Sequence, residues 1–359
     1  MSRNRILICM GAIVLCFAGF NNKFPLLLPG SETYIHAGFT RQVPLDSTAL
    51  YGLFITHASW GRSLWLVILT QALLLSLILY YYFRYFSRHP HFAMFYLACL
   101  FFITFMTLAS VTVSTIGVGI FAGISILCGG LLLFAHDLSK RDRYIMAIAL
   151  VMSAAMDLTH LVVLICISLS YTLGLLCFKT SPWIKTNFRN VAILMTLTIT
   201  AALMIASIHF LLGGGFSVVR DHQMPVPPQL TQLRPIHTDI KMIEDTLSEE
   251  TIKSIYTWYN EDAREFSITR QAGGWLDLQY QDYGQSMVIV ACLSIYGWTL
   301  VRKTRLRHPS LFVYVLTACL MYALTSVLIY GGGGMQWQVA WMVSIPLFIL
   351  VAEVNDIAS

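Results

Sequence analysis

Charged residues are scarce in this chain. Only 11% of its 359 residues are Asp, Glu, Lys or Arg, whereas 57% are hydrophobic. An average soluble domain has about 25% charged residues. A composition this apolar excludes an ordinary soluble domain and favours a lipid bilayer as the solvent.

The chain also lacks the short motifs of several common protein classes. No two of its eight cysteines have C-x-x-C spacing, and all eight lie in apolar stretches, so no disulfide framework is predicted. GGGF at 213–216 and GGGG at 331–334 each end an apolar stretch outside any strand–turn–helix setting, so neither predicts a nucleotide-phosphate loop. The sequence indicates no metal site and leaves any cofactor unknown.

Long apolar runs fill most of the chain. A transmembrane helix needs roughly 20 apolar residues, and the runs predict an all-α polytopic membrane protein, a single transmembrane domain over 1–359 with about ten transmembrane helices. The predicted spans are 5–20, 63–83, 92–111, 116–136, 144–157, 159–178, 190–212, 285–301, 310–330 and 337–352. The fifth and sixth are either two crossings or a tight hairpin that does not fully cross twice.

Basic residues between the predicted spans indicate the orientation. With the N-terminus inside, the inner segments hold 14 Lys and Arg residues, and the short outer loops hold only Lys23, Arg41 and Arg62. Because basic loops stay cytoplasmic, this distribution predicts a bacterial inner-membrane protein with both termini in the cytoplasm. The first span resembles a signal peptide but no A-x-A site follows, so we expect a retained helix. The positive net charge reflects topology, and no nucleic-acid partner is predicted.

Two segments on the predicted outer face interrupt the apolar pattern. The first outer loop spans 21–62. The second spans 216–283 and holds 11 of the 18 acidic residues. Within it, apolar residues between 239 and 258 recur at helical spacing, which predicts amphipathic helices lying on the membrane domain. The second loop is also a candidate binding segment for a protein partner.

The first outer loop has two carboxylates, Glu32 and Asp46. A partly desolvated carboxylate at the edge of a bilayer suits general-base chemistry near neutral pH. Each residue also has a structural interpretation. Glu32 would lie in the first turn of a helix, where negative charge is favourable, and Asp46 would cap the next helix. The sequence leaves both roles open for each carboxylate.

The first 85 residues carry a longer pattern around Glu32. An apolar helix is followed by SETYI (31–35), then by VP (43–44), and then by YGLF (51–54) leading into the second helix. This order resembles the GT-C class of integral-membrane glycosyltransferases, which use polyprenyl-phosphate-linked sugars and keep a catalytic carboxylate, usually Asp, in the first outer loop. The resemblance implies that the partners are a polyprenyl-phosphate-linked sugar donor and the lipids of the membrane. It also implies a catalytic role for Glu32.

A second group of candidate residues lies in SAAMDLTHL (153–161). Asp157 and His160 are three residues apart and share one face if the segment is helical. An ionisable residue at membrane depth is a functional-site hypothesis by default, with Asp157 orienting His160 toward a phosphate. The alternative is a polar turn in which Asp157 caps the sixth span.

Other residues on the predicted outer face are candidates for substrate binding. Arg41 and Arg62 suit a lipid phosphate, although either could simply extend its charge toward water. His209 could join His160 or be a packed residue, and His36 lies in the same loop as Glu32.

Three functions fit this pattern. The first is a glycosyltransferase of the GT-C type, acting on the outer face of the inner membrane in the assembly of a cell-envelope glycan or glycoconjugate. The second is a transporter or flippase for a lipid-linked substrate. Proteins of this kind typically have broken helices and charged residues near the midplane of the membrane. The third is a non-catalytic assembly factor that binds a partner through 216–283.

The predicted topology has a direct test. Reporter fusions after Gly215 and after Arg307 should report opposite sides of the membrane, because one predicted span, 285–301, separates them. Alkaline phosphatase and fluorescent-protein fusions would measure this. Two fusions on the same side would overturn the topology.

Overall fold

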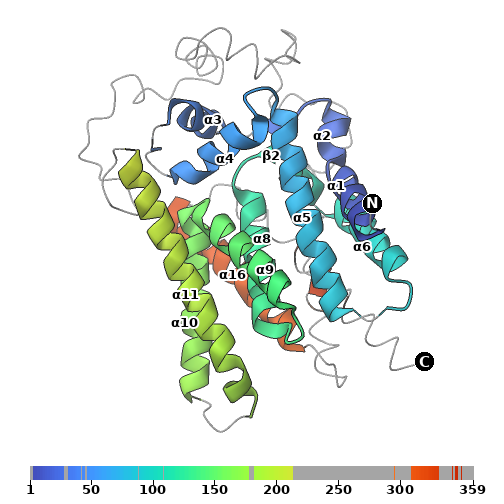
Figure 1. Cartoon of the computed structure of the whole chain (residues 1–359), viewed down its shortest axis with the longest axis vertical. Helices are drawn as coiled ribbons and strands as arrows, with labels where there is room; N and C mark the ends of the chain where they lie inside the picture. The colour runs from blue at the N-terminus through green and yellow to red at the C-terminus, as the bar shows by residue number, and fades with distance from the viewer. Residues whose placement is uncertain are drawn as a thin grey trace.

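The apolar runs of the sequence form helices in the computed structural model (Figure 1). It describes residues 3–27, 31–41, 43–44, 47–87, 89–107, 109–177, 182–212 and 309–330, and positions 295, 342, 344–346 and 349. The predicted 216–283 loop and the predicted spans 285–301 and 337–352 lie wholly or almost wholly outside the described residues. The elements are α1 Arg3–Leu15, α2 Phe17–Asn22, β1 Leu26–Leu27, α3 Ser31–Thr40, α4 Ala49–Ser59, α5 Leu64–Phe86, α6 Phe92–Met106, α7 Ala109–Ser114, β2 Thr115–Ile116, α8 Gly119–Phe134, α9 Lys140–Ala155, α10 Leu158–Cys177, α11 Pro182–Leu211 and α16 Pro309–Tyr330.

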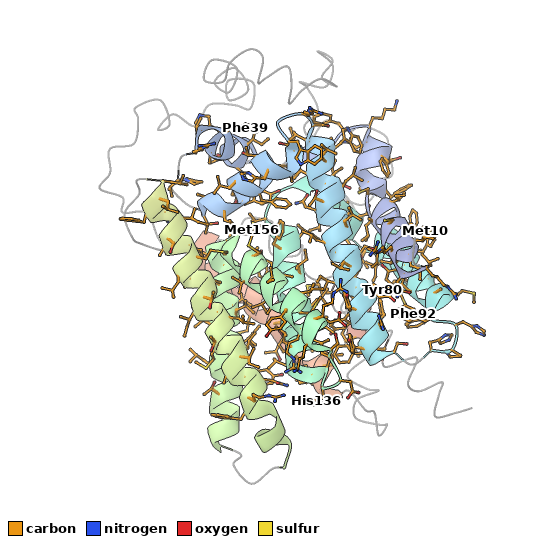
Figure 2. All side chains as sticks on the ribbon, viewed as in Figure 1. Met10, Phe39, Tyr80, Phe92, His136 and Met156 are labelled. Carbon is orange, nitrogen blue, oxygen red and sulfur yellow. The ribbon has the colours of Figure 1, made fainter. Side chains whose placement is uncertain are left out.

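The long helices run up and down and give the bundle two ends. At the lower end of Figure 1, Tyr85 near the end of α5 bonds Asp142 near the start of α9, and Asn190 of α11 bonds the last turn of α8. The upper end carries α3 and α4. Figure 2 shows His136, before α9, toward the lower end and Met156, after α9, toward the upper end.

One helix has the surface of a segment that faces lipid. Two of the described helices are long and apolar enough to cross a membrane, over Leu64–Phe86 and Phe188–Leu211. Only 33% of the apolar window of the second is buried, and Ile199, Leu203 and Phe210 are more than half exposed. The core helix of a soluble protein would bury such side chains, so this exposed apolar face favours a membrane protein.

Most predicted spans in the described part correspond to one helix each. The closely spaced fifth and sixth spans are α9 and α10, which only Met156 and Asp157 separate. The 16 residues of α9 give a helix of about 24 Å, and the 20 residues of α10 give about 30 Å. The second length alone matches a hydrocarbon core of roughly 30 Å.

Two predicted spans are interrupted. The span 5–20 divides at Cys16 into α1 and α2. The span 92–111 was predicted as one helix, but α6 ends at Met106 and a separate short helix, α7, follows. The hydroxyl of Thr107 explains this difference, because it bonds the carbonyl one turn earlier and accepts the N–H two residues later. Such side-chain bonds compete with the helix ladder.

Partners inside the protein satisfy backbone groups near these interruptions. Ser110 Oγ accepts the N–H of Ala18 at 2.8 Å. One turn later, Ser114 Oγ accepts the N–H of Gly19 at 2.9 Å. β1 and β2 then pair in parallel, and every residue from 109 to 118 is buried. We call α2, β1, α7 and β2 the α2–α7 junction; its non-helical backbone is covered by protein, as membrane depth requires.

The first outer loop folds as a helical hairpin, α3 and α4, across the upper end (Figure 1). The two helices touch through glycines. A Cβ added at Gly38 would overlap the carbonyl oxygen of Gly52, and one added at Gly52 would lie 2.7 Å from the Gly38 nitrogen. A larger residue at either position would force the helices apart.

Gly38→Ala should therefore lower the melting temperature of the full chain in detergent, because overpacking of this kind costs about 1–3 kcal/mol. Gly117→Ala is the matched control, since a Cβ there would meet only Thr115 Cγ2, at an ordinary 3.6 Å. Equal melting temperatures for the two variants would contradict the close helix contact.

Candidate functional site

Glu32 lies in the first turn of α3, as predicted. The structure describes its backbone position but not its side chain. The preceding residue, Ser31, begins the helix, and its hydroxyl donates to the carbonyl of Ile116 in β2 at 2.6 Å. This bond fixes the start of α3 on the α2–α7 junction, and the backbone of Glu32 with it.

Asp46 lies outside the described residues. The helix that it was predicted to cap, α4, begins at Ala49, and its N-cap position belongs to Thr48, whose backbone is extended and whose side chain makes no capping hydrogen bond. Because a run of Asp, Ser and Thr offers several possible caps, the role of Asp46 stays a prediction.

Thr48 joins the first outer loop to the Asp157 turn. Its hydroxyl lies 2.9 Å from the carbonyl oxygen of Ala155 and 2.7 Å from that of Met156, and its side chain is buried. These carbonyls belong to the end of α9, directly before Asp157. The structure therefore brings together two regions that are more than 100 residues apart in sequence.

Asp157 is the N-cap residue of α10. Its Oδ1 accepts the N–H of Thr159 at 2.7 Å, and its carbonyl accepts the N–H of Leu161. This geometry matches the structural alternative that the sequence left open. The side chain is buried, with 2% of the residue exposed.

His160 is oriented by a backbone carbonyl. Its Nδ1 lies 3.1 Å from the carbonyl oxygen of Ser153, which can only accept, so Nδ1 carries a proton. Its Nε2 is buried and has no hydrogen-bond partner among the described residues. The ring centroid lies 5.9 Å from that of Tyr322 in α16. The predicted tautomer-setting role of Asp157 thus belongs to Ser153.

The remaining predicted residues are distributed over the upper end. His209 is buried in the last turn of α11, a helix that contacts α4. Arg41 follows α3 with a left-handed φ of 55° and is exposed, as is Arg62, which follows α4.

His36 lies in the middle of α3 and is half-buried. Its Nε2 is enclosed and has no hydrogen-bond partner among the described residues. Burial lowers the pKa of this imidazole below its ordinary 6.5. The side chain is therefore neutral at pH 7 and suits hydrogen bonding to a substrate hydroxyl better than pairing with a phosphate.

Gln71 was not among the sequence-predicted candidates. It is fully buried in α5, and its Nε2 donates to the hydroxyl of Tyr51 at 3.2 Å and to the carbonyl of Gly117 at 3.5 Å. Its Oε1 has no partner among the described residues. The sequence could have identified it, because Gln71 is the only amide side chain in the predicted span 63–83 and a polar side chain within such a span is unusual. It links the hairpin to the α2–α7 junction.

Within the described part of the chain, no three His, Cys, Asp or Glu side chains lie close enough together to hold a metal ion. Comparison with known proteins found no matching family model, no matching curated protein and no matching solved structure. The interpretation of the site therefore depends on its own geometry and on the sequence pattern around Glu32.

Thr48→Val should destabilise the link between α4 and the Asp157 turn. The change keeps the shape of the side chain but removes the donor to two buried carbonyls, a loss worth about 1–3 kcal/mol. Hydrogen exchange of the 47–59 segment and the melting temperature would measure it. Thr70→Val is the control, because Thr70 bonds only the Leu66 carbonyl of its own helix. If both variants behave alike, the link has no special role.

Proposed function

We propose that the protein is a membrane glycosyltransferase of the GT-C type. It would transfer a sugar from a polyprenyl-phosphate donor to an acceptor on the outer face of a bacterial inner membrane, in the assembly of a cell-envelope glycan or glycoconjugate. One observation chiefly supports this proposal. The hairpin that carries the SETYI and YGLF stretches is bonded through Ser31 to β2 and through Thr48 to the end of α9, so Glu32 and His160 belong to one end of the bundle.

The proposed orientation places this upper end outside. The described basic residues gather at the opposite end, on the loops and helix ends around Arg84, Lys140 and Arg189, all of which are exposed. Positively charged ends stay cytoplasmic. Ten spans, two cytoplasmic termini and an outer 216–283 loop complete the proposal.

The proposed reaction needs one base and one anion-binding group. Glu32 accepts the proton of an acceptor hydroxyl, whose oxygen forms a bond to the anomeric carbon of the sugar. The bond from that carbon to the phosphate oxygen breaks, and polyprenyl phosphate leaves as an anion. Because the leaving group is already anionic, it requires no protonation, only stabilisation by a cation such as Arg41 or Arg62.

The buried imidazoles would recognise the sugar in this scheme. The protonated Nδ1 of His160 bonds Ser153, which leaves Nε2 of a neutral ring as an acceptor. Neutral His36 offers the same chemistry from α3. Acceptor nitrogens of this kind bind sugar hydroxyls, and Asp157 holds the start of α10 in place beneath them.

A second candidate function is transport of a lipid-linked substrate. The α2–α7 junction favours it, because two interrupted helices and a buried Gln71 are features of transporter substrate sites. The two proposals predict different fates for the lipid-linked sugar. A transporter moves a labelled polyprenyl-phosphate sugar across proteoliposomes without cleaving it, whereas a transferase releases polyprenyl phosphate. An assembly factor binding a partner through 216–283 would do neither.

Glu32→Gln tests the catalytic proposal. It keeps the shape and hydrogen bonding of the side chain but removes the base, so release of polyprenyl phosphate should fall by about 100-fold or more. The assay uses the full chain in proteoliposomes with a panel of labelled polyprenyl-phosphate-linked hexoses and pentoses. Glu32→Asp should keep measurable activity, because the enzymes that this chain resembles usually carry Asp there.

Asp46→Asn is the matched control for removal of a carboxylate in the same loop, and it should retain activity. If the effects of the two changes are reversed, the base is Asp46. If wild-type protein releases polyprenyl phosphate and neither change alters the rate, the general-base mechanism is wrong. If no donor of the panel is cleaved, the transferase proposal gives way to transport or assembly.

A further inference from the structure

A network of hydrogen bonds at the lower end joins α5 to α9. Tyr85 donates to Asp142 Oδ2 at 2.6 Å, and the backbone N–H of Ser139 donates to the same tyrosine hydroxyl at 3.3 Å. Ser139 Oγ in turn caps α9 by accepting the N–H of Asp142 at 3.1 Å. Tyr81, one turn before Tyr85, lies beside the same carboxylate. We call these four residues the Asp142 cluster.

Two arginines from different helices flank the Asp142 cluster. Arg84 of α5 and Arg141 of α9 both lie close enough to Tyr81 to interact with it electrostatically, and both are exposed. Burial acts to raise the pKa of Asp142, but bonds from Tyr85, Ser139 and Tyr81 and the charge of Arg84 outweigh it and lower that pKa. The carboxylate thus stays ionised and satisfied by hydroxyl groups.

The site keeps an excess of positive charge. Lys140 and Arg143 also lie in the first turn of α9, so with Arg84 and Arg141 this end carries four cations against the carboxylates of Asp137 and Asp142. Because the hydroxyl of Tyr85 already bonds the Asp142 carboxylate, Arg84 and Arg141 remain available to an external anion. Paired guanidinium groups are well suited to a phosphate.

Apolar surface begins directly above this positive charge. On α9, Tyr144 and Ile148 are 71% and 65% exposed, and they follow Arg141 at spacings of three and seven residues, so the three share one face. On α5, Leu73 is 41% exposed and lies eleven residues before Arg84, again on one face. The exposed apolar face of α9 therefore ends in an arginine, and α5 adds an exposed leucine about three turns above Arg84.

We propose that Arg84 and Arg141 bind the headgroup phosphate of an anionic phospholipid, whose acyl chains lie along the exposed faces of α5 and α9. A phospholipid fits both parts of this surface, because its phosphate matches the arginines and its acyl chains match the exposed apolar side chains. Free phosphate matches the arginines alone. The Asp142 cluster positions the two arginines by holding the ends of their helices together. This site lies at the opposite end from Glu32 and does not depend on the proposed function.

The experiment measures lipid binding by the purified full chain with native mass spectrometry and thermal unfolding in detergent. Phosphatidylglycerol is added in one arm, phosphatidylcholine in a second and inorganic phosphate in a third. Wild-type protein should bind phosphatidylglycerol in preference to phosphatidylcholine and gain little stability from inorganic phosphate. The double variant R84Q/R141Q should bind phosphatidylglycerol about thirtyfold more weakly, because each cation near an anionic headgroup contributes roughly fivefold.

The double variant R3Q/R5Q is the matched control. It removes the same number of charges from exposed positions at the lower end of α1, and it should bind phosphatidylglycerol as wild type does. R84K/R141K keeps the charge and should retain most of the affinity, and single R141Q replaces the double variant if that one fails to fold. Equal loss in R3Q/R5Q, equal affinity for the two lipids, or equal stabilisation by inorganic phosphate would each overturn the proposal.

Discussion

A backbone group that leaves a helix inside an apolar protein must find another partner, because no water is there to accept it. The α2–α7 junction meets this constraint with serine hydroxyls and a short parallel strand pair. The carbonyl of Ile116 in β2 then accepts the hydroxyl of Ser31, and that of Gly117, directly after β2, accepts the amide of Gln71. The position of the α3–α4 hairpin, and hence of Glu32, depends on this junction.

The two ends of the bundle have different chemistry. The upper end combines a helical hairpin, a buried carboxylate at Asp157 and buried imidazoles at His160 and His209. The lower end has exposed cations and the carboxylate of Asp142, which accepts a hydrogen bond from the Tyr85 hydroxyl. Desolvated acceptor groups suit recognition of a neutral sugar, and exposed cations suit a membrane surface. The proposed reaction and the proposed lipid site therefore lie at opposite ends.

The sequence predicted the helices better than their interruptions. Runs such as 63–83 and 159–178 are predominantly apolar and long enough to span a bilayer, so composition and length located α5 and α10. The break at Thr107 was invisible, because Thr, Val and Ile continue the apolar run beyond it and the competing bonds are made by a single hydroxyl. The first-turn position of Glu32 followed from the sequence. The bond from Thr48 to Ala155 did not, since no periodicity links residues 107 positions apart.

We propose that a polyprenyl-phosphate sugar binds at the upper end, beside α3 and the start of α10. Cryo-electron microscopy of the full chain in a lipid nanodisc, with a non-cleavable phosphonate analogue of such a donor, tests it most directly. We expect density for the sugar within reach of Glu32 and His160, and density for the phosphonate near Arg41 or Arg62. Density for the analogue only at the lower end, or buried beside Gln71 away from the hairpin, would contradict it.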